Sequence, residues 1–331
     1  LTREKAMRKF ARNILLGALF ASCAIPALAA EAQPKPQAMV DALHSAFGDN
    51  HARAVHAKGI IVTGTFTPDP AAQKISKAKL FVAGKTPVIA RFSNFTGIPT
   101  IPDNIGDANP RGFAVKFQTP GDTEMDVVAH SFNGFPTKNA EEFRQLLLAI
   151  GASGKDAPHP NAVEKFLATH PVAKTFLTTQ KPPPESYGTA EYYGVNAFKF
   201  TDAAGHALFV RYRFVPAAGE HYLDAAAMKT RGADYLQPEL TQRLAKGPVS
   251  FEWYAQLAQK GDVIDNPSVA WPETRKLVKL GTVTITAVAD QAKEDHKLLF
   301  LPANLPDGIE AADPMLLVRN GAYPISFRHR Q

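Results

Sequence analysis

Eight short runs of β-forming residues, in two groups of four, constrain the fold of this chain more than any other feature. Each run is rich in branched and aromatic residues and is bounded by Gly, Pro, Asn or Asp, which is typical of strands that end in turns. The runs are Ile60–Phe66, Pro87–Phe92, Gly112–Phe117, Glu124–Ala129, Tyr193–Thr201, Leu208–Phe214, Val249–Leu257 and Thr282–Val288.

Helical patterns lie around and between these runs. They span Ala38–Phe47, Asn139–Ile150, Asn161–Thr169, Ala225–Arg231, Glu239–Leu244 and Pro314–Asn320. Because strands and helices do not alternate regularly, the order argues against a doubly wound parallel sheet. We therefore expect an α+β fold, an eight-stranded antiparallel β-barrel with helical insertions.

The N-terminus has the pattern of a secretory signal peptide. Five Lys or Arg residues lie within residues 1–12, an apolar run follows over 14–25, and Ala27-Leu28-Ala29 provides a small-x-small cleavage site. The run is shorter than the roughly 20 residues of a typical transmembrane helix. We expect residues 1–29 to direct export to the periplasm. A retained anchor helix and lipoprotein processing at Cys23 stay open as alternatives.

Removal of this leader changes the charge. The 331 residues carry a net charge of +6, with 37 Lys+Arg and 31 Asp+Glu, but residues 30–331 keep 32 and 30, a net of +2. We expect these residues to form a single domain without stable membrane insertion. No basic stripe interleaved with aromatic residues indicates a nucleic-acid partner. The lone cysteine excludes a disulfide framework and a Cys-rich metal site.

Five segments in order along the chain resemble the heme catalases. Residues 53–59 read RAVHAKG, residues 86–93 read TPVIARFS, and residues 109–117 read NPRGFAVKF. Residues 305–311 read LPDGIEA, and residues 319–330 read RNGAYPISFRHR. The resemblance implies the catalase β-barrel, here as one minimal domain that binds heme b with ferric iron. Because the sequence stops soon after the last segment, we expect no C-terminal helical NADPH domain, as in short exported catalase-related peroxidases.

In this resemblance Tyr323 is the proximal iron ligand. Arg319 lies four residues earlier, so one helical turn would place its guanidinium beside the phenol oxygen. A neighbouring cation favours the phenolate form, and an anionic oxygen ligand suits ferric iron.

The resemblance makes His56 the distal acid–base. This histidine would take a proton from the inner peroxide oxygen and return it to the outer one, a task that suits an imidazole. Ser93 matches the serine that orients the imidazole. Without the resemblance, His56 reads as a packed histidine and Ser93 as a polar strand residue.

Three arginines and two apolar residues complete the expected heme site. Arg53, Arg91 and Arg330 match the residues that pair with the heme propionates, for which guanidinium groups are suitable partners. Val55 and Phe143 match apolar residues on the distal side, although Phe143 is equally well explained as plain helix core.

One departure bears on the activity. Ungapped alignment puts His130 where full-length catalases have a catalytic asparagine, and a loop rearrangement that brings in Asn133 stays open. Loss of that amide is expected to impair peroxide dismutation more than the first reaction with peroxide. An external reductant would then complete the cycle.

We therefore expect a heme peroxidase with an antioxidant role and weak catalase activity. Its partners would be an organic hydroperoxide or hydrogen peroxide and an external electron donor, and the protein would be a monomer or a small homo-oligomer. The alternatives are a true catalase, a fatty-acid hydroperoxide isomerase or dehydratase, and a non-enzymatic heme carrier.

Overall fold

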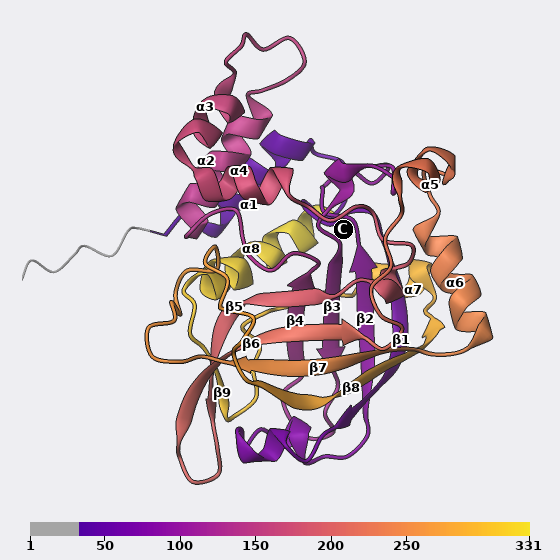
Figure 1. Cartoon of the computed structure of the whole chain (residues 1–331), viewed down its shortest axis with the longest axis vertical. Coiled ribbons are helices and arrows are strands. Elements are labelled where there is room, and N and C mark those ends of the chain that lie inside the picture. Colours follow the sequence, from indigo (N-terminus) through magenta and orange to yellow (C-terminus); the bar gives the residue numbers. More distant parts are fainter. Residues whose placement is uncertain (1–32) are drawn as a thin grey trace, which may run out of the picture. The chain divides into compact units, whose positions relative to one another are not determined.

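A closed antiparallel β-barrel lies at the centre of the computed structural model, which describes residues 33–331 (Figure 1). Its sheet has the order β4-β3-β2-β1-β8-β7-β6-β5-β9, and β4 pairs with β5 to close the barrel. The predicted eight-stranded antiparallel barrel is therefore confirmed. The strands are β1 Gly59–Pro68, β2 Thr86–Ser93, β3 Gly112–Phe117, β4 Met125–His130, β5 Tyr192–Thr201, β6 Ala207–Pro216, β7 Val249–Leu257, β8 Leu277–Val288 and β9 Ile309–Ala311.

A bulge at Gly64 helps the sheet to curve into a barrel. The register between β1 and β8 shifts between Thr63 and Gly64. A Cβ atom on Gly64 would lie 2.0 Å from the carbonyl oxygen of Thr284, so only glycine fits this close approach. Bulges of this kind bend a strand and increase its twist.

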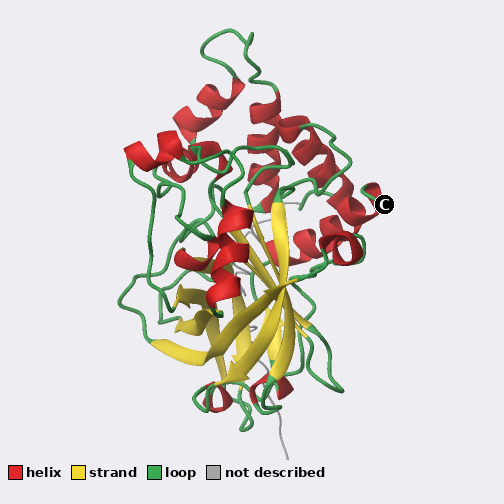
Figure 2. Ribbon diagram, turned by 90° about the vertical axis from the view of Figure 1, so that its right-hand side faces the viewer, coloured by secondary structure: helices red, strands yellow, loops and turns green. Residues whose placement is uncertain are grey.

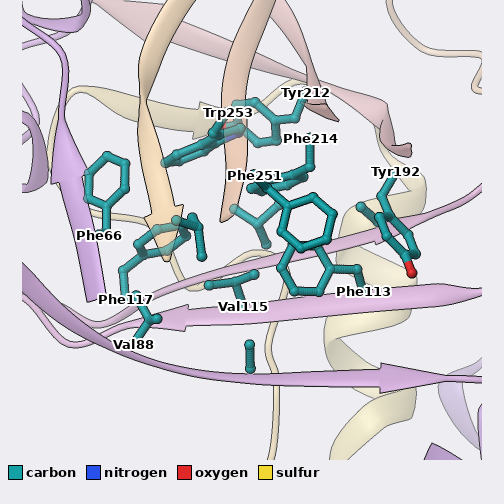
Figure 3. Close-up of a cluster of buried hydrophobic side chains, with 14 of the residues drawn as sticks. Phe66, Val88, Phe113, Val115, Phe117, Tyr192, Tyr212, Phe214, Phe251 and Trp253 are labelled. Atoms are coloured by element: carbon teal, nitrogen blue, oxygen red, sulfur yellow. The ribbon is translucent and has the colours of Figure 1, made fainter. Parts of the chain in front are cut away.

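Aromatic side chains fill the inside of the barrel (Figure 3). Phe117 stacks on Trp253 with ring centroids 4.8 Å apart, and Phe92 stacks on Phe113 at 4.6 Å. All four are almost completely buried. Because a small barrel packed in this way is core and not a pore, a ligand must bind outside it.

The helices gather mainly beyond one end of the strands, as Figure 2 shows. Helices α1, α2 and α8 share a second apolar core that contains Leu43, Leu147 and Val318. The helices are α1 Pro36–Phe47, α2 Ala140–Gly151, α3 Ala162–Thr169, α4 Pro171–Thr178, α5 Ala225–Thr230, α6 Leu236–Lys246, α7 Gln291–Asp295 and α8 Met315–His329, with 3₁₀ turns at Ala72–Lys74, Lys79–Phe81, Gly106–Ala108 and Tyr187–Thr189.

Helix α8 is longer than the sequence predicts. The helix is expected to end at Asn320, yet it continues through Gly321 and Pro324 to His329. Gly321 is required by packing, because a Cβ there would lie 2.6 Å from Cγ of Pro36 in α1. Contacts between these two helices therefore override the local helix-breaking signal.

The sequence also missed α4, α7 and β9, which have eight, five and three residues. Short elements carry little periodicity. The predicted signal peptide, residues 1–29, lies outside the described residues. Within residues 33–331, no helix has the length and apolar character needed to cross a membrane.

Candidate functional site

One apolar cavity lies beside strands β2–β4 and helices α1, α2 and α8. Its empty space, including open solvent at its mouth, is about 1470 Å³. All nine residues that the sequence singled out line it, although they come from distant parts of the chain: Arg53, Val55, His56, Arg91, Ser93, Phe143, Arg319, Tyr323 and Arg330.

His56 lies on the loop before β1 in an unusual backbone conformation. Its φ of 59° falls in the left-handed region, which non-glycine residues seldom adopt. The loop is held there because the amide of His56 donates to the carbonyl of Phe95 at 2.8 Å, while Arg91 donates to the carbonyl of His56 at 2.7 Å. Strain of this kind is common where a side chain must be aimed.

The imidazole of His56 is fixed by two contacts. Ser93 Oγ lies 3.1 Å from Nδ1, and the ring of Phe95 meets the imidazole edge-on with centroids 5.7 Å apart. Within residues 33–331, Nε2 of His56 makes no hydrogen bond and remains free for a ligand. The structure thus brings His56 and Ser93 together as the sequence predicts.

Gly112 leaves room for this pair. It lies opposite Ser93 in the β2–β3 ladder. A Cβ on Gly112 would lie 2.5 Å from Ser93 Oγ and 2.7 Å from His56 Nδ1, closer than side chains tolerate. The glycine in the segment of residues 109–117 therefore serves the geometry of the pair and not the turn.

A second imidazole, that of His130, faces the same cavity. It ends β4, opposite Gly112, and both of its ring nitrogens are buried without a hydrogen-bond partner. Burial, with a smaller contribution from His56, lowers the pKa of His130 to about 3. Burial and the charge of Arg91 likewise lower the pKa of His56 to about 3. Both imidazoles are therefore neutral at physiological pH and able to accept a proton.

Asn133 does not reach this cavity. Its side-chain amide donates to Glu273 Oε1 at 2.8 Å on the exposed side of the loop after β4. Of the two residues that the sequence left open for the position of the catalytic asparagine, His130 is the one that lines the cavity.

Tyr323 lies on α8 and shares this cavity with His56. Arg319, one turn earlier, donates to its phenol oxygen from Nε at 3.0 Å and from a terminal nitrogen at 2.7 Å. Two donors from one cation stabilise negative charge on that oxygen. The predicted pairing of Arg319 with Tyr323 is present, and it suits an oxygen that ligates a metal.

Two residues that the sequence analysis missed hold Arg319. Asn196 accepts from Arg319 at 2.6 Å and donates to Asp313 at 2.7 Å, and Asp313 also accepts from the backbone amide of Met315 at 2.9 Å. Burial raises the pKa of Asp313. Asn196 lies in a buried apolar strand where the β5–β6 register shifts, and a lone polar residue in such a run was the available signal.

Two of the three predicted propionate arginines meet at one edge of the cavity. Arg53 contacts the carboxylate of Asp295, and Arg330 donates to the backbone carbonyls of Asp295 at 2.7 Å and of Leu298 at 2.9 Å. Partial burial raises the pKa of Asp295, but the charge of Arg53 outweighs it, so the pKa is lowered. One carboxylate thus faces an excess of guanidinium charge, which leaves room for further anionic groups.

Arg91 holds the loop of His56 as well as facing the cavity. Its terminal nitrogens donate to the carbonyls of His56 and Ala57 at 2.7 and 2.8 Å, while its buried Nε has no partner. The sequence predicts a role toward a propionate only. In the structure, Nε and the second N–H of each terminal nitrogen are the donors left for it.

Apolar rings form most of the remaining wall. Phe143 lines the cavity, packs against Phe135 with centroids 4.8 Å apart, and packs on the core shared by α1, α2 and α8. Its place on the distal side of a heme stays a prediction. Val55 packs on the same core. The ring centroids of Phe135 and Phe176 also lie 6.5 and 6.2 Å from that of His130.

These residues fit the heme that the resemblance implies. The cavity is apolar, a phenol oxygen that accepts two hydrogen bonds from a cation would suit an iron ligand, and neutral imidazoles with unpartnered nitrogens line the same space. The surplus of guanidinium groups at one edge suits two carboxylates.

Comparison with known proteins gives one family. A family model described as Catalase matches residues 49–331. The chain is 35% identical to a catalase-related peroxidase of Synechococcus elongatus, over 96% of this chain and 95% of that protein. It is 36% identical to a catalase-related peroxidase of Mycolicibacterium paratuberculosis, over 89% and 94%.

Longer proteins match as well. The catalase of Rattus norvegicus is 30% identical over 84% of this chain, which spans 56% of that protein. The crystal structure of a fungal catalase superposes with a TM-score of 0.75 at 22% identity, over 84% of this chain and 59% of the fungal chain. Catalase A from Saccharomyces cerevisiae gives a TM-score of 0.75, also at 22% identity. These structures share the fold.

Proposed function

Because the chain belongs to the catalase family of heme-dependent oxidoreductases, we propose that it is a peroxidase that reduces organic hydroperoxides with an external electron donor. Hydrogen peroxide is a second substrate, and dismutation is weak. The overall reaction converts a hydroperoxide and a two-electron donor into an alcohol, water and the oxidised donor.

Heme, when bound, supplies the redox chemistry that accepts two oxidising equivalents from the peroxide O–O bond. Tyr323 would hold the iron through its phenol oxygen, and Arg319 donates two hydrogen bonds to that oxygen. Arg53, Arg330 and the free Nε of Arg91 would hold the propionates. A Tyr-ligated ferric iron is the family's known starting state.

His56 moves the proton. Because its pKa is lowered to about 3, its free Nε2 is unprotonated at neutral pH and accepts the proton of the incoming peroxide. The same nitrogen then returns the proton to the outer oxygen, so that this oxygen leaves as an alcohol or water. Ser93 and the backbone contacts of the loop keep the ring in position, and such a shuttle contributes about 10²–10⁴ in rate.

The observation that carries the proposal is His130. A neutral imidazole with two unpartnered nitrogens lines the cavity, at the sequence position that ungapped alignment equates with the amide that positions the second peroxide in full-length catalases. An imidazole differs from that amide in shape and in the placement of its one donor. Reduction by a second peroxide is thus disfavoured, and an external donor completes the cycle.

The apolar wall supports organic hydroperoxides as substrates. Three phenylalanine rings lie beside the two imidazoles, with ring centroids 5.7 to 6.5 Å apart: Phe95, Phe135 and Phe176. An alkyl or aryl tail buries apolar area against these rings, which hydrogen peroxide does not.

Steady-state kinetics on the heme-loaded protein test this function. Cumene hydroperoxide with a chromogenic donor is compared with hydrogen peroxide, with and without that donor. Faster turnover of the organic substrate, dependent on the donor, is the expected result. Rapid oxygen release from hydrogen peroxide alone would indicate a true catalase. Rearranged fatty-acid hydroperoxide without donor oxidation would indicate an isomerase or dehydratase.

The proposal includes an antioxidant role in the periplasm. It rests on the predicted signal peptide of residues 1–29. Fractionation of cells that express the full chain should recover the processed protein with the periplasmic contents, and recovery of unprocessed protein in the cytoplasm would contradict this part.

A further inference from the structure

A cluster of metal-ligand side chains lies away from the cavity, where α1 and α8 end. His44 is in the last turn of α1, His329 is in the last turn of α8, and Asp49 lies just beyond α1. One nitrogen from each imidazole and one carboxylate oxygen all lie within 4.8 Å of one another. Among residues 33–331, these three residues form the one group of this kind.

The spacing is close to that of a tetrahedral site. With bonds of roughly 2.0–2.2 Å to nitrogen and oxygen, the ligand atoms of tetrahedral zinc lie about 3.3 Å apart. His329 Nε2 and Asp49 Oδ2 are 3.3 Å apart. The rings of His44 and His329 have centroids 4.8 Å apart, and small rotations of partly exposed side chains bring the third ligand in.

The surrounding charges favour a cation. Both imidazoles sit at helix C-termini, where the helix dipole is negative. The neighbouring Arg330 points away from the cluster, toward the carbonyls beside the cavity.

His51 lies against the cluster without belonging to its three ligand residues. His51 stacks on His329 with centroids 5.8 Å apart and planes 10° apart, and its backbone amide donates to Asp49 Oδ1 at 3.3 Å. Its φ of 48° is the other left-handed non-glycine conformation among the described residues, after that of His56. The loop thus holds a third imidazole against the cluster.

We propose that His44, Asp49 and His329 bind a divalent transition metal such as Zn²⁺, with water in the fourth position. Imidazole nitrogen with one carboxylate suits Zn²⁺, whereas Mg²⁺ and Ca²⁺ prefer oxygen ligands. Bound metal links α1 to α8, the helix that carries Tyr323, and so stabilises their packing. This site is independent of the peroxidase proposal.

Titration calorimetry and thermal unfolding with ZnCl₂ test the site on tag-free, heme-loaded protein stripped with EDTA. We expect one Zn²⁺ per chain, a raised unfolding midpoint and no response to MgCl₂. His44→Gln and His329→Gln each lower the Zn²⁺ affinity at least about tenfold, because ligands matter more than the outer contacts whose loss already costs 10–100-fold.

His206→Gln is the matched control. His206 also pairs with a carboxylate, Asp202, at 3.0 Å on the surface, but within residues 33–331 no second imidazole joins that pair. Zn²⁺ affinity should be unchanged in this variant. Asp49→Asn, which keeps the side-chain shape, gives a third way to weaken the site, and an unchanged heme spectrum in each variant shows that the fold is intact. Equal Zn²⁺ affinity in wild type and in the three site variants would refute the proposal.

Discussion

The substitution Gly112→Ala tests whether the placement of His56 determines the rate. The added Cβ would lie 2.5 Å from Ser93 Oγ and 2.7 Å from His56 Nδ1, whereas ordinary contact begins at 3.4 Å. The imidazole and the hydroxyl must therefore move by about 0.7–0.9 Å. Overpacking of this kind costs about 1–3 kcal/mol of stability. Misplacement of a catalytic group by about 1 Å lowers the rate about 100-fold.

The assay measures kcat/KM for cumene hydroperoxide with a chromogenic donor, together with the heme spectrum and the urea midpoint. We expect kcat/KM to fall about 100-fold while heme stays bound through Tyr323, on the other side of the site. Gly154→Ala is the control, because nothing lies within 4 Å of its added Cβ. It should behave like the wild type.

A Gly112→Ala enzyme with the wild-type kcat/KM would refute the reasoning, because His56 would then work equally well from a displaced position. Loss of heme in parallel with activity would also count against it, since the clash involves the distal pair and not Tyr323.

Three other variants and one pH titration extend the test. His56→Ala should keep heme but lower the rate of reaction with peroxide about 10²–10⁴-fold in stopped-flow traces. Tyr323→Phe should lose the heme absorbance on gel filtration, because no phenolate remains for the iron. His130→Asn should raise oxygen release from hydrogen peroxide by about tenfold or more, measured with an oxygen electrode. The free energy of unfolding of the wild type should fall as the pH drops from 6.5 toward 3, because unfolded imidazoles take up protons that buried His56 and His130, with pKa values of about 3, do not. Each buried imidazole contributes up to about 1.4 kcal/mol per pH unit to the fall in the free energy of unfolding. His130→Asn should therefore roughly halve the contribution of the two histidines to this pH dependence, measured by urea unfolding.

The strands were predictable because their signal is local. All eight predicted runs are strands of the barrel, since branched and aromatic residues bounded by turn residues mark each one. The end of α8 was not predictable from local sequence. Gly321 and Pro324 are helix breakers, but packing against Pro36, a residue far away in the sequence, overrides their effect.

The functional site likewise has residues that the sequence predicts and residues that only the folded structure reveals. Motif resemblance found nine residues that line the cavity, including His56 and Tyr323. It missed Asn196 and Asp313, which support Arg319 and reach it only through a register shift in β5 and the start of α8. It also left His130 and Asn133 open, because only the path of the chain after β4 decides which side chain turns inward.

The stoichiometry of the reaction with hydrogen peroxide tests the central claim most directly. Heme-loaded protein is given a known amount of hydrogen peroxide and an excess of donor, and both oxidised donor and released oxygen are measured. The account predicts one two-electron equivalent of donor oxidised for each peroxide consumed, with little oxygen. Half a molecule of oxygen released per peroxide, with the donor untouched, would contradict it.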